Sequence, residues 1–185
     1  MAILKIARMG HPVLKRKAEP IADPKVPEIQ RLIRDMLETL ADIGGAGLAA
    51  PQVHVPLRLV IFHVPEARVG KEDGPGAAAV PLTVLINPEI EPLGEEMAAG
   101  LEACLSVPGL AGMVPRHTHI RYRGLDAAGQ PVEREARGFH ARVVQHECDH
   151  LDGVLYPMRM TDLSTLSFVE EMRRSAEAEA ATDLD

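Results

Sequence analysis

The stretch His-Glu-Cys-Asp-His at residues 146–150 constrains the fold of this 185-residue chain more than any other feature. Two histidines four positions apart lie on one face of an α-helix, where both imidazoles can bind one metal ion. Glu147 lies about 100° around the helix, so its carboxylate can reach over an open metal position as a general base. Cys148 points to the opposite side, where a small packing residue is expected. The fold should therefore be built around this helix.

A catalytic metal site needs a third protein ligand and one open position. Tyr156 stands where a longer HExxHxxGxxH pattern would supply a third histidine, which disfavours that class of metalloprotease. Glu170 and Glu171 stand where another class of zinc peptidase has its glutamate, although surface charge explains them as well. Cys104, in the apolar segment LEACLSVPG, is the third candidate, because a thiolate is a strong ligand for such metals. A buried core cysteine is the alternative explanation for Cys104.

The composition predicts one globular domain. A length of 185 residues suits a single domain with a short extension, and a hydrophobic share of 46% is ordinary. The net charge of −7, without a basic stripe, argues against a nucleic-acid-binding surface. No signal peptide or membrane-spanning run is found, and two cysteines do not form a disulfide framework. We expect a reduced, soluble, cytoplasmic protein with no nucleic-acid or membrane partner.

Helical periodicity and turn residues predict three helices. The first follows Asp23 and Pro24, which resemble an N-cap and a first helical residue, and ends at Gly44. The central helix covers residues 138–151 and contains both histidines. The last helix begins near Asp162 and decays into a polar, frayed end. Its apolar stripe consists of Leu163, Leu166, Val169 and Met172.

Apolar and β-branched residues predict strands at residues 57–64, 83–86, 117–125 and 132–137. Asn87-Pro88 should end the second strand, residues 126–129 form a turn, and residues 66–81 form a surface loop. Helices and strands are segregated along the chain, which favours an α+β fold. Small antiparallel or mixed sheets would wrap around the central helix, with one further helix near each terminus. Residues 1–160 would form a single catalytic domain, and residues 161–185 the C-terminal helix and polar tail.

Three segments, in order along the chain, resemble the signature motifs of the peptide deformylase family. They are GAGLAAPQ at residues 45–52, EACLS at residues 102–106 and QHECDHLDG at residues 145–153. The similarity to type 1 bacterial and organellar members covers most of residues 4–160. The resemblance implies that Cys104, His146 and His150 hold one divalent metal ion. It also implies that this ion is natively Fe(II), with Zn(II), Ni(II) or Co(II) able to occupy the site.

The family's reaction is metal-dependent hydrolysis of the N-formyl group from the first methionine of newly synthesised proteins. The resemblance implies that Glu147 takes a proton from a metal-activated water and passes it to the departing amine. The side chain of Gln52 and the backbone N–H of Leu105 would stabilise the negative charge on the former carbonyl oxygen. The expected partners are N-formylmethionyl nascent peptides, with the ribosome as a further candidate.

The segment GAGLAAPQ carries almost no reactive side chain, which suits recognition by backbone. The N–H and C=O groups of Ala46 and Gly47, and of Ala103 across the cleft, can pair with an extended peptide. Such pairing ignores side chains, as an enzyme with many substrates requires. A tight loop alone would explain the glycines but not Gln52.

Two further pairs of residues are expected near the metal. Phe139 and Val143, which precede His146 at helical spacing, are candidates for the wall of a methionine pocket, although core packing explains them equally. Asp149 and Arg116 could orient the helix that carries the two histidines without binding the metal themselves.

The sequence departs from the family at two positions. Ala103 replaces the glycine of the usual EGCLS motif, and Ala111 stands where an arginine that meets the peptide is often found. These departures leave two alternatives open. One is a deformylase-like protein that binds peptide or metal without catalysis, and the other is a zinc endopeptidase that uses Glu170.

Overall fold

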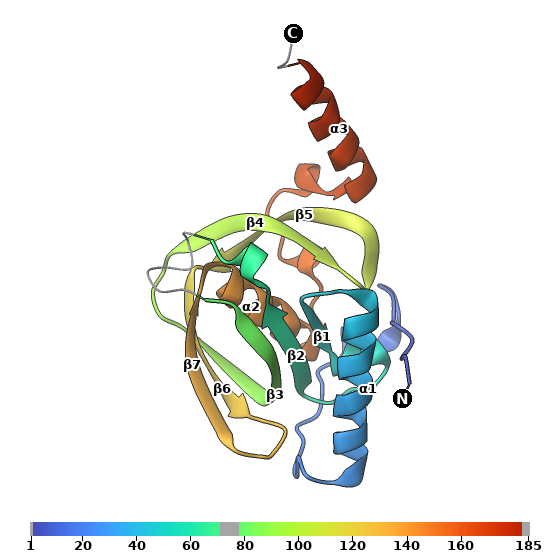
Figure 1. Cartoon of the computed structure of the whole chain (residues 1–185), viewed down its shortest axis with the longest axis vertical. Coiled ribbons are helices and arrows are strands. Elements are labelled where there is room, and N and C mark those ends of the chain that lie inside the picture. Colours follow the sequence, from blue (N-terminus) through green and yellow to red (C-terminus); the bar gives the residue numbers. More distant parts are fainter. Residues whose placement is uncertain (1, 71–77, 183–185) are drawn as a thin grey trace.

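Two antiparallel sheets surround one central helix in the computed structural model, which describes residues 2–70 and 78–182 (Figure 1). The central helix α2 covers Gly138–Leu151, as predicted. Among the described residues, one sheet has the strand order β1-β2-β3-β6-β7 and the other has the order β4-β5-β8. Helix α1 covers Pro27–Ile43 and helix α3 covers Val169–Thr182, one towards each end of the chain. The predicted α+β class is confirmed.

The larger sheet contains β1 (Gly47–Ala49), β2 (Leu59–Val64), β3 (Val80–Pro92), β6 (His119–Leu125) and β7 (Pro131–Arg137). The smaller sheet contains β4 (Met97–Cys104), β5 (Val107–His117) and β8 (Ser167–Phe168). All pairings between these strands are antiparallel, and β1 and β4 are each the edge strand of their sheet. The predicted hairpin is present as β6 and β7, whose residues pair from His119–Arg137 to Leu125–Pro131.

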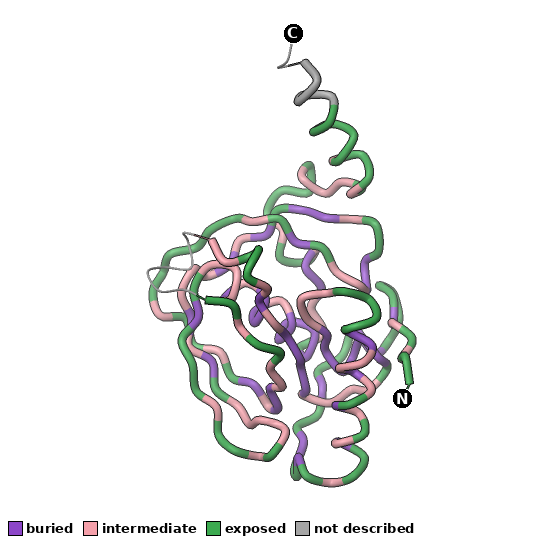
Figure 2. The backbone as a smooth tube through the Cα atoms, viewed as in Figure 1, coloured by how far each residue is buried: buried purple, intermediate pink, exposed green. Residues whose placement is uncertain are grey.

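Helix α2 lies in the densest part of the molecule, where the buried segments gather (Figure 2). Ala141, Val144 and Leu151 are fully buried on it, and they belong to the same core cluster as Val60 and Phe62 of β2. A helix enclosed in this way can hold side chains at fixed positions, because close packing leaves few alternative rotamers. The central helix is therefore a rigid support for the residues that it carries.

Helix α1 begins later than predicted. Its first residue is Pro27 and its N-cap is Val26, whereas the Asp23 side chain accepts a hydrogen bond from the backbone N–H of Lys25 within a preceding turn. The residue before a proline is disfavoured in the α region, and Val26 is extended, with ψ at 144°. Pro27 thus excludes a helical start at Pro24. The predicted end is correct, because Gly44 adopts φ +77° and caps the helix.

Strand β3 is longer than predicted, because Asn87 does not end it. Asn87 has a φ of +50°, and the pairing register shifts between Ile86 and Glu89, which identifies a β-bulge. The Asn87 side chain accepts from the N–H of Ile21 and donates to its carbonyl, at 2.9 and 2.8 Å. The bulge is therefore held from outside the sheet, and the strand continues beyond it to Pro92.

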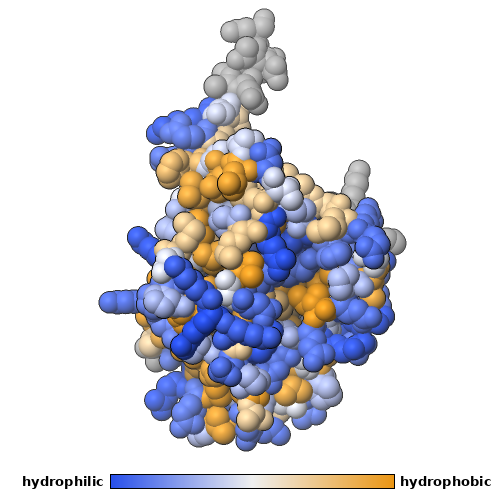
Figure 3. All heavy atoms as spheres, turned by 180° about the vertical axis from the view of Figure 1, so that it is seen from behind, coloured by the Kyte–Doolittle hydropathy of each residue, from blue (hydrophilic) through white to orange (hydrophobic). Residues whose placement is uncertain are grey.

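The C-terminal segment also differs from the prediction. Asp162 caps only a short 3-10 turn, Leu163–Thr165, by accepting from Ser164 N. The chain then extends as β8, which pairs with β5, and α3 starts at Val169. The helix projects from the body and continues to Thr182, past the point where fraying was expected (Figure 1). Hydrophobic surface lies at the base of α3 in Figure 3, and Leu163 and Phe168 are both exposed.

The long hairpin of β4 and β5 was not predicted, apart from the strand-like setting of Cys104. Of the expected loop at residues 66–81, residues 66–68 form a 3-10 helix, Val80 already belongs to β3, and residues 71–77 lie outside the described residues. No helix in the described part of the chain is long and apolar enough to cross a membrane.

Candidate metal centre

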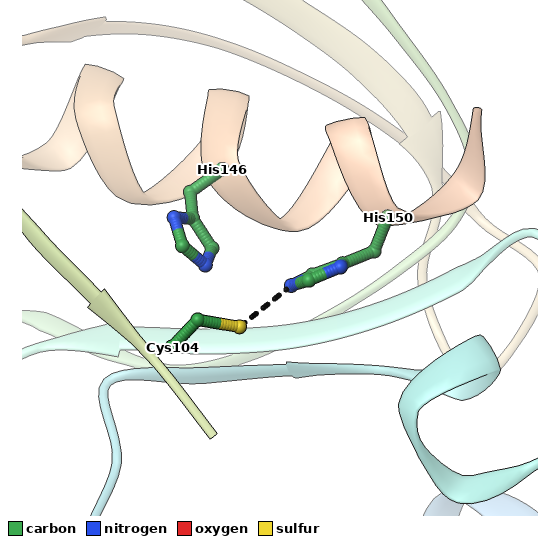
Figure 4. Close-up of side chains that lie close together, drawn as sticks. All are labelled: Cys104, His146 and His150. Atoms are coloured by element: carbon green, nitrogen blue, oxygen red, sulfur yellow. Dashed lines mark hydrogen bonds between the residues drawn. The ribbon is translucent and has the colours of Figure 1, made fainter. Parts of the chain in front are cut away.

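Three side chains converge where the end of β4 meets the face of α2. His146 and His150 project from the helix towards Cys104, the last residue of the strand (Figure 4). One ligand atom from each of the three lies within 4.8 Å of the other two, and the Cys104 Sγ is 3.3 Å from Nε2 of His150. Among the described residues this is the one group of three or more such side chains that could share an ion.

The contacts of these side chains and the neutral state of His150 fit a divalent metal ion. Burial keeps the pKa of His150 well below its ordinary value, so its imidazole is neutral, as a metal ligand must be. Nδ1 of His146 lies 2.8 Å from Glu102 Oε2, which leaves Nε2 to face the cluster. One thiolate and two imidazoles suit Fe(II) or Zn(II). The donor set therefore fits a divalent metal ion, as the motif resemblance implied, without distinguishing Fe(II) from Zn(II).

Glu102 is the centre of a buried ionic network that the sequence prediction missed. Its two oxygens accept from Arg116 Nε and Nη2, both at 2.9 Å, and Oε2 also contacts His146. Burial would raise the pKa of Glu102, but the hydrogen bonds from Arg116 and His146 outweigh it and lower this pKa to about 2. A sequence signal existed, because residues two apart on a strand share one face, and Glu102 precedes Cys104 by two positions.

The predicted contact between Arg116 and Asp149 is present, with Arg116 Nη1 donating to Asp149 Oδ2. Asp149 also accepts from Arg159, so the network links β5 to the helix that carries the histidines. A second missed residue is Arg142, which donates to Glu102 at 2.9 Å and to the carbonyls of Ala98 and Val114. These contacts fasten the β4–β5 hairpin to α2.

Glu147 is buried beside the metal ligands, at 5% exposure. Burial raises the pKa of its carboxyl group to about 7, so the group can both accept and release a proton near neutral pH. Its Oε2 has no hydrogen-bond partner within the described residues. The carboxylate packs against Gly47 of β1, where a β-carbon would overlap with it.

The Gln52 side chain is oriented by its neighbours. Its Oε1 accepts from Ala49 N at 2.8 Å, which directs Nε2 towards Cys104 Sγ at 3.5 Å and Ser106 Oγ at 3.2 Å. The amide donor thus faces the metal centre and not the solvent, and Gln52 is 2% exposed. Leu105 follows Cys104 in the turn between β4 and β5, and both Leu105 and Gln52 line a cavity beside this cluster.

A cavity of about 520 Å³ opens onto two of the three candidate ligands, Cys104 and His146. Phe139 and Val143 line it from α2, and Gly47 and Ala103 line it from the edge strands β1 and β4. The Ala46 carbonyl already accepts a hydrogen bond from His63 N at 2.9 Å, so this oxygen is partly committed to the sheet. A wider cavity on the opposite face of α2, lined by Gln145 and Cys148, contains neither the ligands nor Glu147.

The structure separates the remaining candidates. Glu170 and Glu171 are exposed in the first turn of α3, away from the cluster, which counts against a zinc endopeptidase with Glu170 as ligand. Tyr156 stacks on His146 with ring centroids 6.3 Å apart, and its hydroxyl has no hydrogen-bond partner among the described residues. Cys148 is a buried core residue, as predicted. Ala111 is buried opposite Ser167 of β8 and does not line the cavity.

A partly buried Cys-His-His donor set, a carboxylate with a raised pKa and an amide donor define a single-metal hydrolase site within an α+β fold. A model of the polypeptide deformylase family matches residues 3–165. The chain is 56% identical to peptide deformylase 1 of Bordetella pertussis over 165 residues, which cover 89% of this chain and 92% of that protein. The chain therefore belongs to the polypeptide deformylase family, whose members are metal-dependent enzymes.

Solved structures of peptide deformylases are also similar to this chain. The peptide deformylase of Ehrlichia chaffeensis matches with a TM-score of 0.80 and 31% identity over 89% of this chain and 91% of that one. A Met-Ala-Ser-bound class I type b peptide deformylase from Acinetobacter baumannii matches with a TM-score of 0.77 and 36% identity, over 86% of this chain and 99% of that one.

Proposed function

We propose that this chain hydrolyses the N-formyl group from the formylmethionine of newly synthesised proteins and releases formate. The observation that carries this proposal is the cluster of Cys104, His146 and His150 beside the cavity that Glu147 and Gln52 line. Membership of the deformylase family supports it, as does the Met-Ala-Ser peptide bound to the Acinetobacter relative.

Cys104, His146 and His150 would hold the metal, for which we propose Fe(II) as the native ion, with Zn(II), Ni(II) or Co(II) as substitutes. When bound, the ion supplies Lewis acidity to the water and to the formyl group. Glu102 and Asp149 would hold the ligands in place without contacting the metal. Glu102 orients the His146 ring, and Asp149 connects the helix that carries the histidines to Arg116.

Glu147 is the proposed general acid and base. Its carboxylate takes a proton from the attacking water, whose oxygen forms the new bond to the formyl carbon. The same group then gives this proton to the methionine nitrogen as the C–N bond breaks, so formate and a free amine leave. A pKa of about 7 suits both steps. The close packing of Glu147 on Gly47 restricts the position of the carboxylate.

Gln52 and Leu105 are the proposed donors to the negatively charged oxygen that develops during attack. The Gln52 amide is held by Ala49 N and is neutral, so it can stabilise that charge without competing for the metal. The backbone N–H of Leu105 follows directly after the ligand Cys104 and would act from the other side. Removal of one such donor typically costs about 10²–10³ in kcat.

The edges of β1 and β4 are the proposed binding site for the peptide backbone. Both are edge strands, and both line the cavity, so an extended peptide can add a strand between them. Gly47, the N–H of Ala46 and Ala103 would supply the pairing groups. Phe139 and Val143 would form part of the wall around the methionine side chain.

We propose residues 1–160 as the catalytic domain and residues 161–185 as an extension of it. The start of that extension contributes to the site, because β8 pairs with β5 and Val169 lines the cavity. A cytoplasmic location and contact with the ribosome follow from the proposed substrate, since nascent chains arise there.

The test is formate release from formyl-Met-Ala-Ser by protein purified without oxygen and loaded with Fe(II) or Ni(II). We expect release from the parent protein and its loss in Glu147→Ala, with one metal ion per chain in both. Absence of release from metal-loaded parent protein would instead favour the non-catalytic binder. In that case Ala103→Gly is the next variant, because Ala103 is exposed at the edge of β4 where the peptide would pair.

A further inference from the structure

The two arginines that line the active-site cavity differ in what they contact. Arg142 lies 2.9 Å from Glu102 and is also bound by backbone carbonyls, so its charge is already compensated. Arg68 is exposed, and within the described part of the chain it forms no ion pair. Its guanidinium is therefore the positive charge in this cavity that remains available to a ligand.

The position of Arg68 is fixed by β2 and α2. Arg68 ends the 3-10 helix Glu66–Arg68, which follows β2 directly, and its N–H donates to Pro65 O at 2.9 Å. Its Cζ lies 5.1 Å from the ring centroid of Phe139, in the first turn of α2. This cation–π contact holds the guanidinium over the ring without neutralising it.

The distance along α2 indicates which part of a peptide would meet Arg68. Phe139 precedes His146 by seven residues, which corresponds to about 10 Å along a helix axis. An extended peptide covers about 10 Å in roughly three residues. With the formyl group next to His146 and the methionine side chain against Val143 and Phe139, the second or third residue after the methionine can come within reach of the Arg68 guanidinium on the Phe139 ring.

The charges of the molecule make this contact selective. The chain has a net charge of −7, so an acidic peptide is repelled in general. An unpaired guanidinium offers a planar fork that matches a carboxylate with two hydrogen bonds. Arg68 thus provides a local attraction for a negative group at one position of the substrate.

We propose that Arg68 is a specificity-determining residue that favours peptides with a carboxylate two or three residues after the formylmethionine. The inference rests on the proposed function for its substrate, and it goes beyond that function by assigning a charge preference to one side chain. The carboxylate is either an Asp or Glu side chain or the terminal carboxylate of a very short peptide.

Paired substrates distinguish a side-chain carboxylate from a terminal carboxylate. Formyl-Met-Ala-Asp-amide against formyl-Met-Ala-Asn-amide reports on the side chain, and formyl-Met-Ala-Ser against its amide reports on the terminus. For at least one pair, we expect kcat/KM in the parent to favour the carboxylate about two- to fivefold, as for an exposed ion pair. The ratio should approach one in Arg68→Met and should decrease as salt is added. Arg34→Met is the matched control, because Arg34 is exposed on α1 and lies outside the cavity.

A binding measurement keeps the two proposals separable. The products Met-Ala-Asp-amide and Met-Ala-Asn-amide are titrated into each variant by calorimetry, which requires no turnover. Tighter binding of the Asp product by the parent and by Arg34→Met, but not by Arg68→Met, supports the inference even if no substrate is deformylated. Equal ratios of carboxylate to neutral ligand in the parent and in Arg68→Met, for both kcat/KM and product affinity, would overturn the inference about Arg68. That result would leave the deformylation proposal intact.

Discussion

The α-carbon of Gly47 lies directly against the carboxylate of Glu147, so that a β-carbon at this position would overlap with Oε1. Gly47 belongs to β1, the edge strand that lines the cavity opposite β4. The strand can come this close to Glu147, the proposed general base, only because it lacks a side chain here. The bare backbone of GAGLAAPQ therefore has a use besides the proposed peptide pairing, since the absence of a side chain at Gly47 leaves room for the Glu147 carboxylate.

Gly47→Ala should lower kcat by about 10²-fold, because a displaced general base loses its alignment with the reacting groups. Metal content should stay at one ion per chain, since the three ligands are untouched. Steady-state kinetics and metal analysis check both expectations. Gly45→Ala is the control, because its β-carbon would meet mainly the flexible ends of Leu40 and Leu105. Equal losses in the two variants would contradict the specific role of Gly47.

Cys104→Ser should reduce the metal affinity strongly, whereas Glu170→Gln should leave it unchanged. The reason is that Cys104 lies in the ligand cluster and Glu170 is exposed on α3. Competition with a chelator measures both variants on one scale. A loss of metal in Glu170→Gln would revive the zinc endopeptidase alternative.

Glu102→Gln should destabilise the metal-free protein by about 3 kcal/mol, because it removes one of the two charge partners of the buried Arg116 and leaves only Asp149. It should also weaken metal binding by about 10- to 100-fold through the lost orientation of His146. Urea denaturation and chelator competition measure the two effects. In contrast, Glu133→Gln breaks only exposed pairs with Arg121 and Arg123 and should cost less than about 1 kcal/mol.

The stability contributed by Glu102 should depend on pH in one direction. Its pKa is lowered from 4.5 to about 2 in the folded protein, so the unfolded chain takes up the proton first as the pH falls. The contribution is therefore complete above pH 4.5 and is lost as the pH falls towards 2. Urea denaturation of metal-free protein between about pH 6 and pH 3 should show a gap between parent and Glu102→Gln that narrows with acid. A constant gap would argue against this pKa.

Tyr156→Phe should leave the protein equally stable or stabilise it by about 1 kcal/mol. The Tyr156 hydroxyl is buried and has no hydrogen-bond partner among the described residues, while its ring stacks on His146. The substitution removes the unpaired hydroxyl and keeps the stacked ring. Tyr156→Leu, which loses the ring, should be clearly less stable. Thermal denaturation separates these cases, and a large loss in Tyr156→Phe would reveal a partner for the hydroxyl.

Local sequence signals predicted the elements whose residues lie close together in the chain. Helix α2 and the β6–β7 hairpin were predicted because their periodicity and turn residues are local. The prediction was wrong at the start of α1, where Pro27 overrides the apparent cap at Asp23. It was also wrong at β3 and at Asp162, where contacts with Ile21 and with β5 decide the conformation. Those contacts join residues far apart in the sequence.

At the metal site, too, local features could be predicted from the sequence, whereas contacts between distant segments could not. Helical spacing alone predicted that His146 and His150 share one helix face, because four residues make about one turn of an α-helix. The motif resemblance added Cys104, and only the folded chain brings its Sγ to 3.3 Å from His150. The network of Glu102, Arg116 and Arg142, the contact of Gly47 with Glu147 and the burial of Ala111 were decided by tertiary structure alone. Each depends on how β4 and β1 pack against α2, and helical or strand periodicity carries no information about packing between distant segments.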